Sequence, residues 1–213
     1  MTGSRPWPWL AVALALGLPA SLMGWVPLDQ PLSAWPAWAA ALALQPDQGW
    51  QQAPWVYWTA AWLHGSADHY LGNLLALVAV AALGHAGRMP PAAGLAWALA
   101  WPLTQIGMLA HPELSRYIGL SGVLHAGVAI LGIFHLVARH PGAHSGMGTV
   151  LLGGLALKVF MENPWQTPLV ASAESAITVA PWAHFSGSLA GCALGLLIAL
   201  ARRPVQPPLA TPD

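Results

Sequence analysis

Six long apolar stretches, separated by short segments that hold most of the charged residues, constrain this chain more than any other feature. They run over about 7–25, 68–86, 92–110, 119–138, 146–160 and 180–201. A helix of roughly 20 apolar residues crosses the hydrocarbon core of a bilayer. Only 7% of the 213 residues are charged, whereas a soluble domain carries about 25%. The sequence therefore predicts an all-α polytopic membrane protein with six transmembrane helices.

The first apolar stretch has two interpretations, a cleaved signal peptide or a retained membrane anchor. Arg5 precedes it, as a basic residue precedes many signal peptides. The run is long for the apolar region of a signal peptide, and Pro19 and Trp25 make a poor cleavage site. We therefore expect this stretch to remain as the first membrane helix.

Residues 27–63 contain too many prolines to form a membrane-spanning helix. Six tryptophans also lie between residues 35 and 62 (Trp35, Trp38, Trp50, Trp55, Trp58 and Trp62). Because indole rings favour the bilayer interface, we expect an interfacial loop with a short helix near residues 37–44. Residues 1–201 are expected to form one membrane domain, and the proline-rich tail 202–213 is expected to be disordered.

The distribution of charge predicts an orientation. Five of the seven basic residues fall on the side of the amino terminus, namely Arg5, Arg88, Arg139, Arg202 and Arg203. Placing both termini in the cytoplasm therefore satisfies the positive-inside rule. The acidic residues then fall outside, namely Asp29, Asp47, Asp68, Glu113, Glu162 and Glu174.

Two basic residues depart from this pattern. Arg116 falls in an outer loop, and Lys158 lies near the outer end of the fifth stretch with Glu162 four residues later.

Zero net charge without a basic block argues against a nucleic-acid partner. The single Cys192 excludes an internal disulfide and a cysteine-based metal cluster.

Strongly polar residues occur at the start of each even-numbered stretch, at one predicted depth. His64, His69 and Asn73 surround the start of the second, Ser121 begins the fourth and His184 begins the sixth. Such side chains in membrane segments usually face the bundle interior or a water-filled cavity, and they mark function. The sequence therefore predicts a reactive site just below the outer surface.

The segment G-L-S-G, residues 119–122, places Ser121 at a helix start. Small flanking residues let another backbone approach the hydroxyl, and the first helical N–H groups have no intrahelical partner and can bind an oxyanion. These features suit a nucleophile. The same motif also occurs as an ordinary tight turn or as a small-residue contact between helices.

A glycine stripe predicts a close contact between the fourth and sixth stretches. The stripe follows His184 at i+3, i+7 and i+11, as Gly187, Gly191 and Gly195. The fourth stretch offers a matching surface of small residues, namely Gly122, Ala126 and Gly127. This contact would bring His184 within reach of Ser121 as its general base. Since neither stretch contains an acidic residue, we expect a Ser–His dyad without a third member. Alternatively, His184 only forms a hydrogen bond with a neighbouring helix.

Three further polar residues have both chemical and structural interpretations. His69 and Asn73 share a helix face and can donate to an oxyanion, although they could equally form an interhelical clamp. His64 and His69 would be about 140° apart on one helix, and no H-E-x-x-H motif occurs. We therefore expect neither a metal nor a cofactor. Four other histidines fall at the predicted cytoplasmic ends, namely His85, His135, His140 and His144.

Three motifs together closely resemble those of the rhomboid intramembrane serine proteases, over the second to sixth stretches. They are H-G-S-A-D-H-Y-L-G-N (64–73), G-L-S-G (119–122) and A-H-F-S-G-S-L-A-G (183–191). The resemblance implies a six-helix rhomboid-like bundle. It implies Ser121 as nucleophile, His184 as base, and His69, Asn73 and the Ser121 N–H as the oxyanion site.

The resemblance also assigns supporting residues. It makes His64 a structural residue of the first loop, and the motif glycines that support the site are Gly119, Gly122, Gly187 and Gly191. Where the family usually has an aromatic residue four positions after the serine, this chain has His125. Because His125 shares a helix face with Ser121, we expect it to support His184 and not to react itself.

The segment G-L-S-G-V-L-H and the short chain resemble the rhombosortase branch of this family. That resemblance implies cleavage of membrane proteins that carry a C-terminal Gly-Gly sorting signal. It places the site on the periplasmic side of a bacterial inner membrane, with a transmembrane protein as substrate and the lipid bilayer as surroundings. The sequence does not predict an oligomeric state.

Two other functions are compatible with the composition. A catalytically silent rhomboid-like protein would bind and escort membrane helices. Silent relatives typically lack the counterpart of Ser121 or of His184, whereas this chain has both residues. A small transporter needs polar sites reachable from both sides of the membrane, whereas this chain concentrates its polar groups at one depth. An active serine protease is therefore the expected function.

Overall fold

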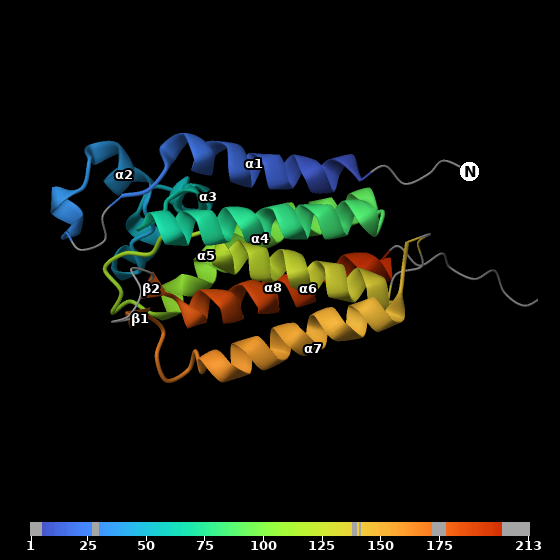
Figure 1. The fold of residues 1–213 in the computed structure, drawn as a ribbon. Helices are drawn as coiled ribbons and strands as arrows, with labels where there is room; N and C mark the ends of the chain where they lie inside the picture. Colours follow the sequence, from blue (N-terminus) through green and yellow to red (C-terminus); the bar gives the residue numbers. More distant parts are fainter. Residues whose placement is uncertain (1–5, 27–29, 138–139, 141, 172–177, 202–213) are drawn as a thin grey trace, which may run out of the picture.

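The computed structural model describes residues 6–26, 30–137, 140, 142–171 and 178–201, which are almost entirely helical. The long helices run side by side (Figure 1). They are α1 (Trp7–Met23), α4 (Ala67–Ala86), α5 (Pro91–Ile106), α6 (Ser121–Val137), α7 (Ser145–Glu162) and α8 (Pro181–Ala201).

Short elements connect the long helices. They are η1 (Leu32–Ala34), α2 (Ala37–Leu42), η2 (Pro46–Gln51), α3 (Val56–Thr59), η3 (Ala60–Trp62) and η4 (Gly107–Ala110). A small hairpin precedes α8, in which β1 (Val170–Ala171) pairs antiparallel with β2 (Thr178–Val179). The described part of 27–63 thus forms no long helix, and α2 falls inside the predicted range 37–44.

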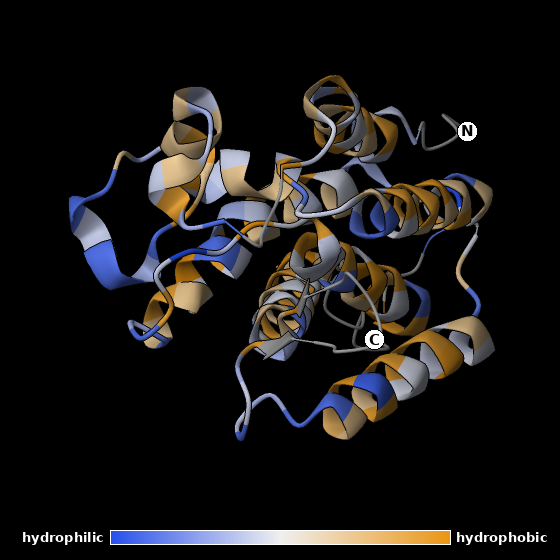
Figure 2. Cartoon of the chain, turned by 60° about the vertical axis from the view of Figure 1, so that its left-hand side comes forward, coloured by the Kyte–Doolittle hydropathy of each residue, from blue (hydrophilic) through white to orange (hydrophobic). Residues whose placement is uncertain are grey.

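Among the described residues, three helices are long and apolar enough to cross a membrane. They are α4, α5 together with η4 (Pro91–Ala110), and α8. Helices α1 and α6 are also apolar but shorter, at 17 residues each. Hydrophobic residues extend along the long helices, while hydrophilic residues are concentrated in the connections (Figure 2). These features indicate an integral membrane protein, while the full count of six spans stays a prediction.

The helix bounds agree with the predicted stretches to within a few residues, and one small difference affects a charged residue at the end of α7. Residues from Met161 onward were expected to form a loop, whereas α7 continues to Glu162. An ion pair from Lys158 to Glu162, one turn apart, stabilises this last turn. Asn163 then ends the helix in a left-handed conformation, with φ of 50°.

Some predictions fall on residues outside the described ranges. They concern Arg5, Asp29, Arg139, Glu174, Arg202, Arg203 and the tail 202–213. The charge-based orientation and the expected disorder of the tail therefore remain predictions.

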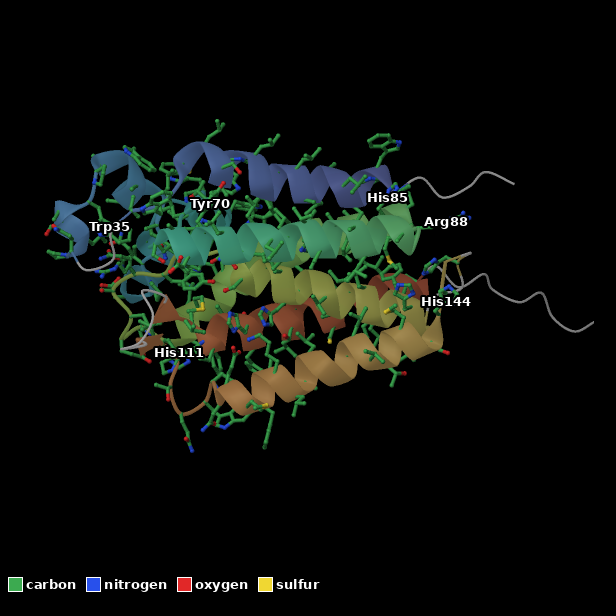
Figure 3. The ribbon with its side chains drawn as sticks, viewed as in Figure 1. Trp35, Tyr70, His85, Arg88, His111 and His144 are labelled. Carbon is green, nitrogen blue, oxygen red and sulfur yellow. The ribbon has the colours of Figure 1, made fainter. Side chains whose placement is uncertain are left out.

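The two ends of the bundle carry different residues. Trp35, Tyr70 and His111 lie at one end, and His85, Arg88 and His144 lie at the other (Figure 3). The first of these ends also holds α2, α3, the hairpin and the starts of α4, α6 and α8 (Figure 1). The polar residues at the starts of these three helices therefore share one depth, as the alternating topology predicts.

Two fully buried tryptophans occupy the centre of the core. The rings of Trp9 and Trp97 lie with centroids 4.3 Å apart. Each indole N–H donates to a backbone carbonyl of another helix, Trp9 to Val80 at 3.2 Å and Trp97 to Val123 at 2.9 Å. The rings thus bury a large apolar area without leaving a polar atom unpaired.

Helices α6 and α8 meet through their glycines. A Cβ added to Gly187 would lie 1.9 Å from the carbonyl oxygen of Gly122, and one added to Gly191 would lie 2.4 Å from that of Ala126. The predicted contact is confirmed at these positions. Gly195 is looser, because its nearest neighbour would be 3.4 Å away. The prediction that Gly127 belongs to this contact surface is wrong, because Gly127 faces the Trp97 ring of α5 instead.

We expect Gly187→Ala to destabilise the protein by about 1–3 kcal/mol or more, because the added methyl group forces α6 and α8 apart. Gly153→Ala in α7 is the matched control, since nothing lies within 4 Å of an added Cβ there. Alanine favours a helix by about 1 kcal/mol over glycine, so this control should unfold no earlier than the parent. The midpoint of thermal unfolding in detergent measures the stability of each variant. Equal midpoints for Gly187→Ala and Gly153→Ala would contradict the close contact between α6 and α8.

Candidate active site

Ser121 and His184 lie within hydrogen-bond distance at the starts of α6 and α8. The Ser121 hydroxyl oxygen is 2.9 Å from His184 Nε2. Ser121 is the first residue of α6, and His184 occupies the first turn of α8. His184 is 5% exposed, so its ring is shielded from its surroundings. The predicted approach of these two residues is confirmed.

Gly119 shapes the turn that delivers Ser121 to the site. Its φ of 131° lies in a region that side chains with a Cβ rarely adopt. A Cβ at this position would also lie 3.0 Å from Cε1 of His69. Glycine at position 119 therefore permits both the entry into α6 and the close approach of the His69 ring.

His69 and Asn73 enter the same site from α4. The Ser66 hydroxyl accepts a hydrogen bond from the His69 backbone N–H at 3.2 Å and caps the helix. His69, Asn73, Ser121 and His184 together line a cavity of about 190 Å³. Among the described residues, Asn73 Nδ2 is buried without a hydrogen-bond partner. A buried, unpaired donor beside a serine is suited to bind a developing oxyanion.

His64 supports the His69 ring. Its side chain is 1% exposed, its Nδ1 donates to the Trp62 carbonyl at 3.2 Å, and its ring meets that of His69 edge to face at 5.0 Å. The predicted 140° separation of the two histidines is wrong, because His64 precedes the cap Ser66 and lies outside α4. Burial and, secondarily, the neighbouring His69 lower the pKa of His64 to about 4. His64 is therefore neutral near pH 7.

His125 covers one face of the His184 ring. The two rings are stacked, with centroids 4.0 Å apart and an interplanar angle of 11°. His125 Nδ1 donates to the carbonyl oxygen of Ser121 at 2.7 Å, because a carbonyl can only accept. This contact fixes the plane of the His125 ring and agrees with the supporting role predicted for it.

The expectation that His184 has no acidic neighbour is wrong. Glu162 Oε2 lies 2.7 Å from His184 Nδ1. Neither the fourth nor the sixth stretch contains a carboxylate, whereas Glu162 is the last residue of α7. One signal was available, because Lys158 and Glu162 were placed as an i, i+4 pair at the outer end of the fifth stretch. That is the depth of Ser121.

A larger cavity of about 490 Å³ continues from the site between α4, α6 and α7. Its polar lining includes Asn73, Ser121, His125, Lys158 and His184. The rest of the lining is apolar, as with Val80 of α4, Leu124 of α6 and Leu155 of α7. The site therefore opens onto a space that can hold apolar side chains next to a serine hydroxyl.

One group of side chains could be considered for a metal ion. His125, Glu162 and His184 each place a potential ligand atom within 4.8 Å of the others. Both ring nitrogens of His184 are already occupied, by Ser121 and Glu162. The nitrogen lone pairs of the two stacked rings also lie in two nearly parallel planes, so they do not converge on one point as the ligands of a metal ion must. We therefore assign no metal to this group.

No protein-family model matches the chain, and no curated protein matches it significantly. Any assignment of function therefore depends on the chemistry of the site itself. That chemistry consists of a serine paired with a histidine, a buried unpaired amide donor, and an adjoining cavity with a largely apolar lining.

The buried neutral His64 predicts a loss of stability in acid. Unfolding restores its ordinary pKa near 6.5, so the unfolded chain binds the extra proton. Stability contributed by neutral His64 is present above about pH 6.5 and is lost as the pH falls towards 4. His64→Gln should remove on the order of 3 kcal/mol of the difference in unfolding free energy between pH 7 and pH 4. An equal difference in parent and variant, measured by chemical denaturation in detergent, would rule this out.

Proposed function

We propose that this chain is an intramembrane serine protease in which Ser121 is the nucleophile and His184 is the general base. The 2.9 Å approach of the Ser121 hydroxyl to His184 Nε2 is the observation that carries the proposal. A serine hydroxyl is a weak nucleophile until a base removes its proton, and histidine is the usual base. The motifs that resemble rhomboid proteases add support.

The proposal includes a topology of six membrane spans formed by α1 and α4–α8, with both termini in the cytoplasm. Three of these helices are long and apolar enough to cross. The site then lies near the outer face, which is the periplasmic face of a bacterial inner membrane. Water reaches the polar residues from that side, and a substrate helix approaches from the lipid.

The reaction we propose is acyl transfer through an enzyme ester. His184 takes the Ser121 proton, the oxygen attacks the scissile carbonyl, and a tetrahedral intermediate forms. The Ser121 backbone N–H and the side chains of His69 and Asn73 stabilise its oxyanion. His184 then protonates the leaving amine. In the second half, His184 takes a proton from water, the hydroxide attacks the ester, and the proton returns to the Ser121 oxygen as the acid product leaves.

The substrate class is a membrane protein whose helix unwinds near its outer end. A helix engages its carbonyls in i to i−4 hydrogen bonds, so attack requires local unwinding. Glycine lowers the cost of unwinding because it destabilises a helix interior. This preference agrees with the C-terminal Gly-Gly signals that the resemblance to rhombosortases implies.

We expect a fluorophosphonate probe to label the detergent-solubilised parent protein. Ser121 forms a bond to phosphorus, fluoride leaves, and the hydroxyl proton passes to His184. Labelling should disappear in Ser121→Ala and His184→Ala, as measured by in-gel fluorescence of folded protein. An unlabelled but folded parent would contradict the protease and favour a catalytically silent protein that binds membrane helices.

We also expect Asn73→Ala to lower the labelling rate roughly 100- to 1000-fold, because one oxyanion donor is lost. Gln48→Ala is the control, since it removes an exposed amide from the first loop. Its labelling rate should equal that of the parent. A parent-like rate in Asn73→Ala would exclude the amide from the oxyanion site.

A further inference from the structure

We infer that Glu162 is a positioning residue for His184, so that the reactive unit is Ser121–His184–Glu162, and that Lys158 holds the Glu162 carboxylate in place. The inference deepens the proposed function and rests on it. It changes the predicted two-residue unit into one with three members, drawn from α6, α8 and α7.

The carboxylate of Glu162 determines which ring nitrogen of His184 carries the proton. An ionised carboxylate can only accept, so the 2.7 Å contact requires His184 Nδ1 to donate to Glu162 Oε2. In a neutral ring Nε2 then carries no proton and accepts from the Ser121 hydroxyl at 2.9 Å. The contact thus fixes the tautomer in which His184 can act as a base.

The charge of Glu162 acts on the same ring during the reaction. When His184 takes the serine proton it becomes an imidazolium ion in a shielded site, which costs free energy without a negative partner. The Glu162 side chain is 19% exposed and that of His184 is 6% exposed. Their attraction is therefore weakened less by solvent than that of a surface pair.

Lys158 binds the other oxygen of the same carboxylate. Its ammonium group pairs with Glu162 Oε1 from one turn earlier in α7. Both carboxylate oxygens are thus engaged, Oε1 by Lys158 and Oε2 by His184, and rotation of the side chain would break both contacts. Lys158 also favours the ionised form of Glu162, because it is an adjacent opposite charge.

Helix α7 packs closely against α6 at the end away from Glu162. A Cβ added to Gly148 would lie 2.7 Å from the Gly132 carbonyl of α6, which fixes the distance between the two helices at that end. Glu162 and Lys158 both line the 190 Å³ cavity beside Ser121. A substrate bound there would lie next to the group that positions the base.

A second histidine–carboxylate pair provides a matched comparison. His111 Nδ1 lies 2.6 Å from Glu113 Oε1, but the Glu113 side chain is 57% exposed and neither residue lines either of the two cavities at the site. Glu113→Gln therefore makes the same chemical change away from Ser121. It controls for general effects of removing a carboxylate.

The test is the rate of fluorophosphonate labelling measured across pH. Titratable or charged groups that share the site with His184 come from three other helices. They are Glu162 and Lys158 of α7, His125 of α6, and Asp68 and His69 of α4. Labelling requires unprotonated His184, so the rate falls in acid with a midpoint that reports its protonation.

Glu162→Gln should lower the maximal labelling rate about 100-fold or more, through loss of the charge and of the fixed tautomer. It should also move the acid midpoint to lower pH, because the imidazolium loses its negative partner. Lys158→Met should also lower the maximal labelling rate, by less than Glu162→Gln does, because the carboxylate that orients His184 is then held by one oxygen only. Glu113→Gln should leave both rate and midpoint as in the parent.

Two outcomes for Glu162→Gln would overturn the inference. One is a parent-like rate and midpoint. The other is a lower rate with an unmoved midpoint, because that result indicates a merely structural role for Glu162. If Glu162→Gln does not fold, Lys158→Met decides, since a parent-like labelling rate there also overturns the inference. A folded parent that is not labelled at any pH contradicts instead the proposed protease, so the two failures are distinguishable.

Discussion

The direct backbone contact between α6 and α8 is the interaction on which the site depends. Gly187 faces the carbonyl oxygen of Gly122 at a distance that leaves no room for a side chain. Ser121 directly precedes Gly122, and His184 lies one turn before Gly187. Because a serine side chain is short, only such a close approach brings its hydroxyl to within 2.9 Å of the imidazole. The glycines therefore set the geometry of the reactive pair.

Around this contact the polar groups are paired largely with backbone carbonyls. Trp182 of α8 donates to Gly107 at 2.8 Å, and the Ser186 hydroxyl donates to Thr104 at 3.0 Å. These bonds join the start of α8 to the α5–η4 segment. In an apolar environment, polar side chains such as these form hydrogen bonds between helices. The rigid support contrasts with the unpaired Asn73 donor, which stays available to a ligand.

The two stacked histidines beside Ser121 differ in what their ring nitrogens contact. His184 has both ring nitrogens aimed at other members of the site, a hydroxyl and a carboxylate. His125 is anchored by Nδ1 to the carbonyl of Ser121, within its own helix, and presents a ring face. Identical side chains are thus held in different ways, because their ring nitrogens meet different partners.

The sequence by itself determined the helices and the meeting of α6 with α8. A membrane span needs about 20 apolar residues, so long apolar runs locate helices well, and glycines one turn apart mark a close contact. Such periodic signals describe one helix and its own faces. Only the tertiary structure decided that α7 lies beside α8 with Glu162 against His184, and that His64 meets the His69 ring from outside α4. Neither contact leaves a periodic pattern in the sequence. Each joins residues of two different segments, and the packing of the whole bundle determines which segments lie side by side.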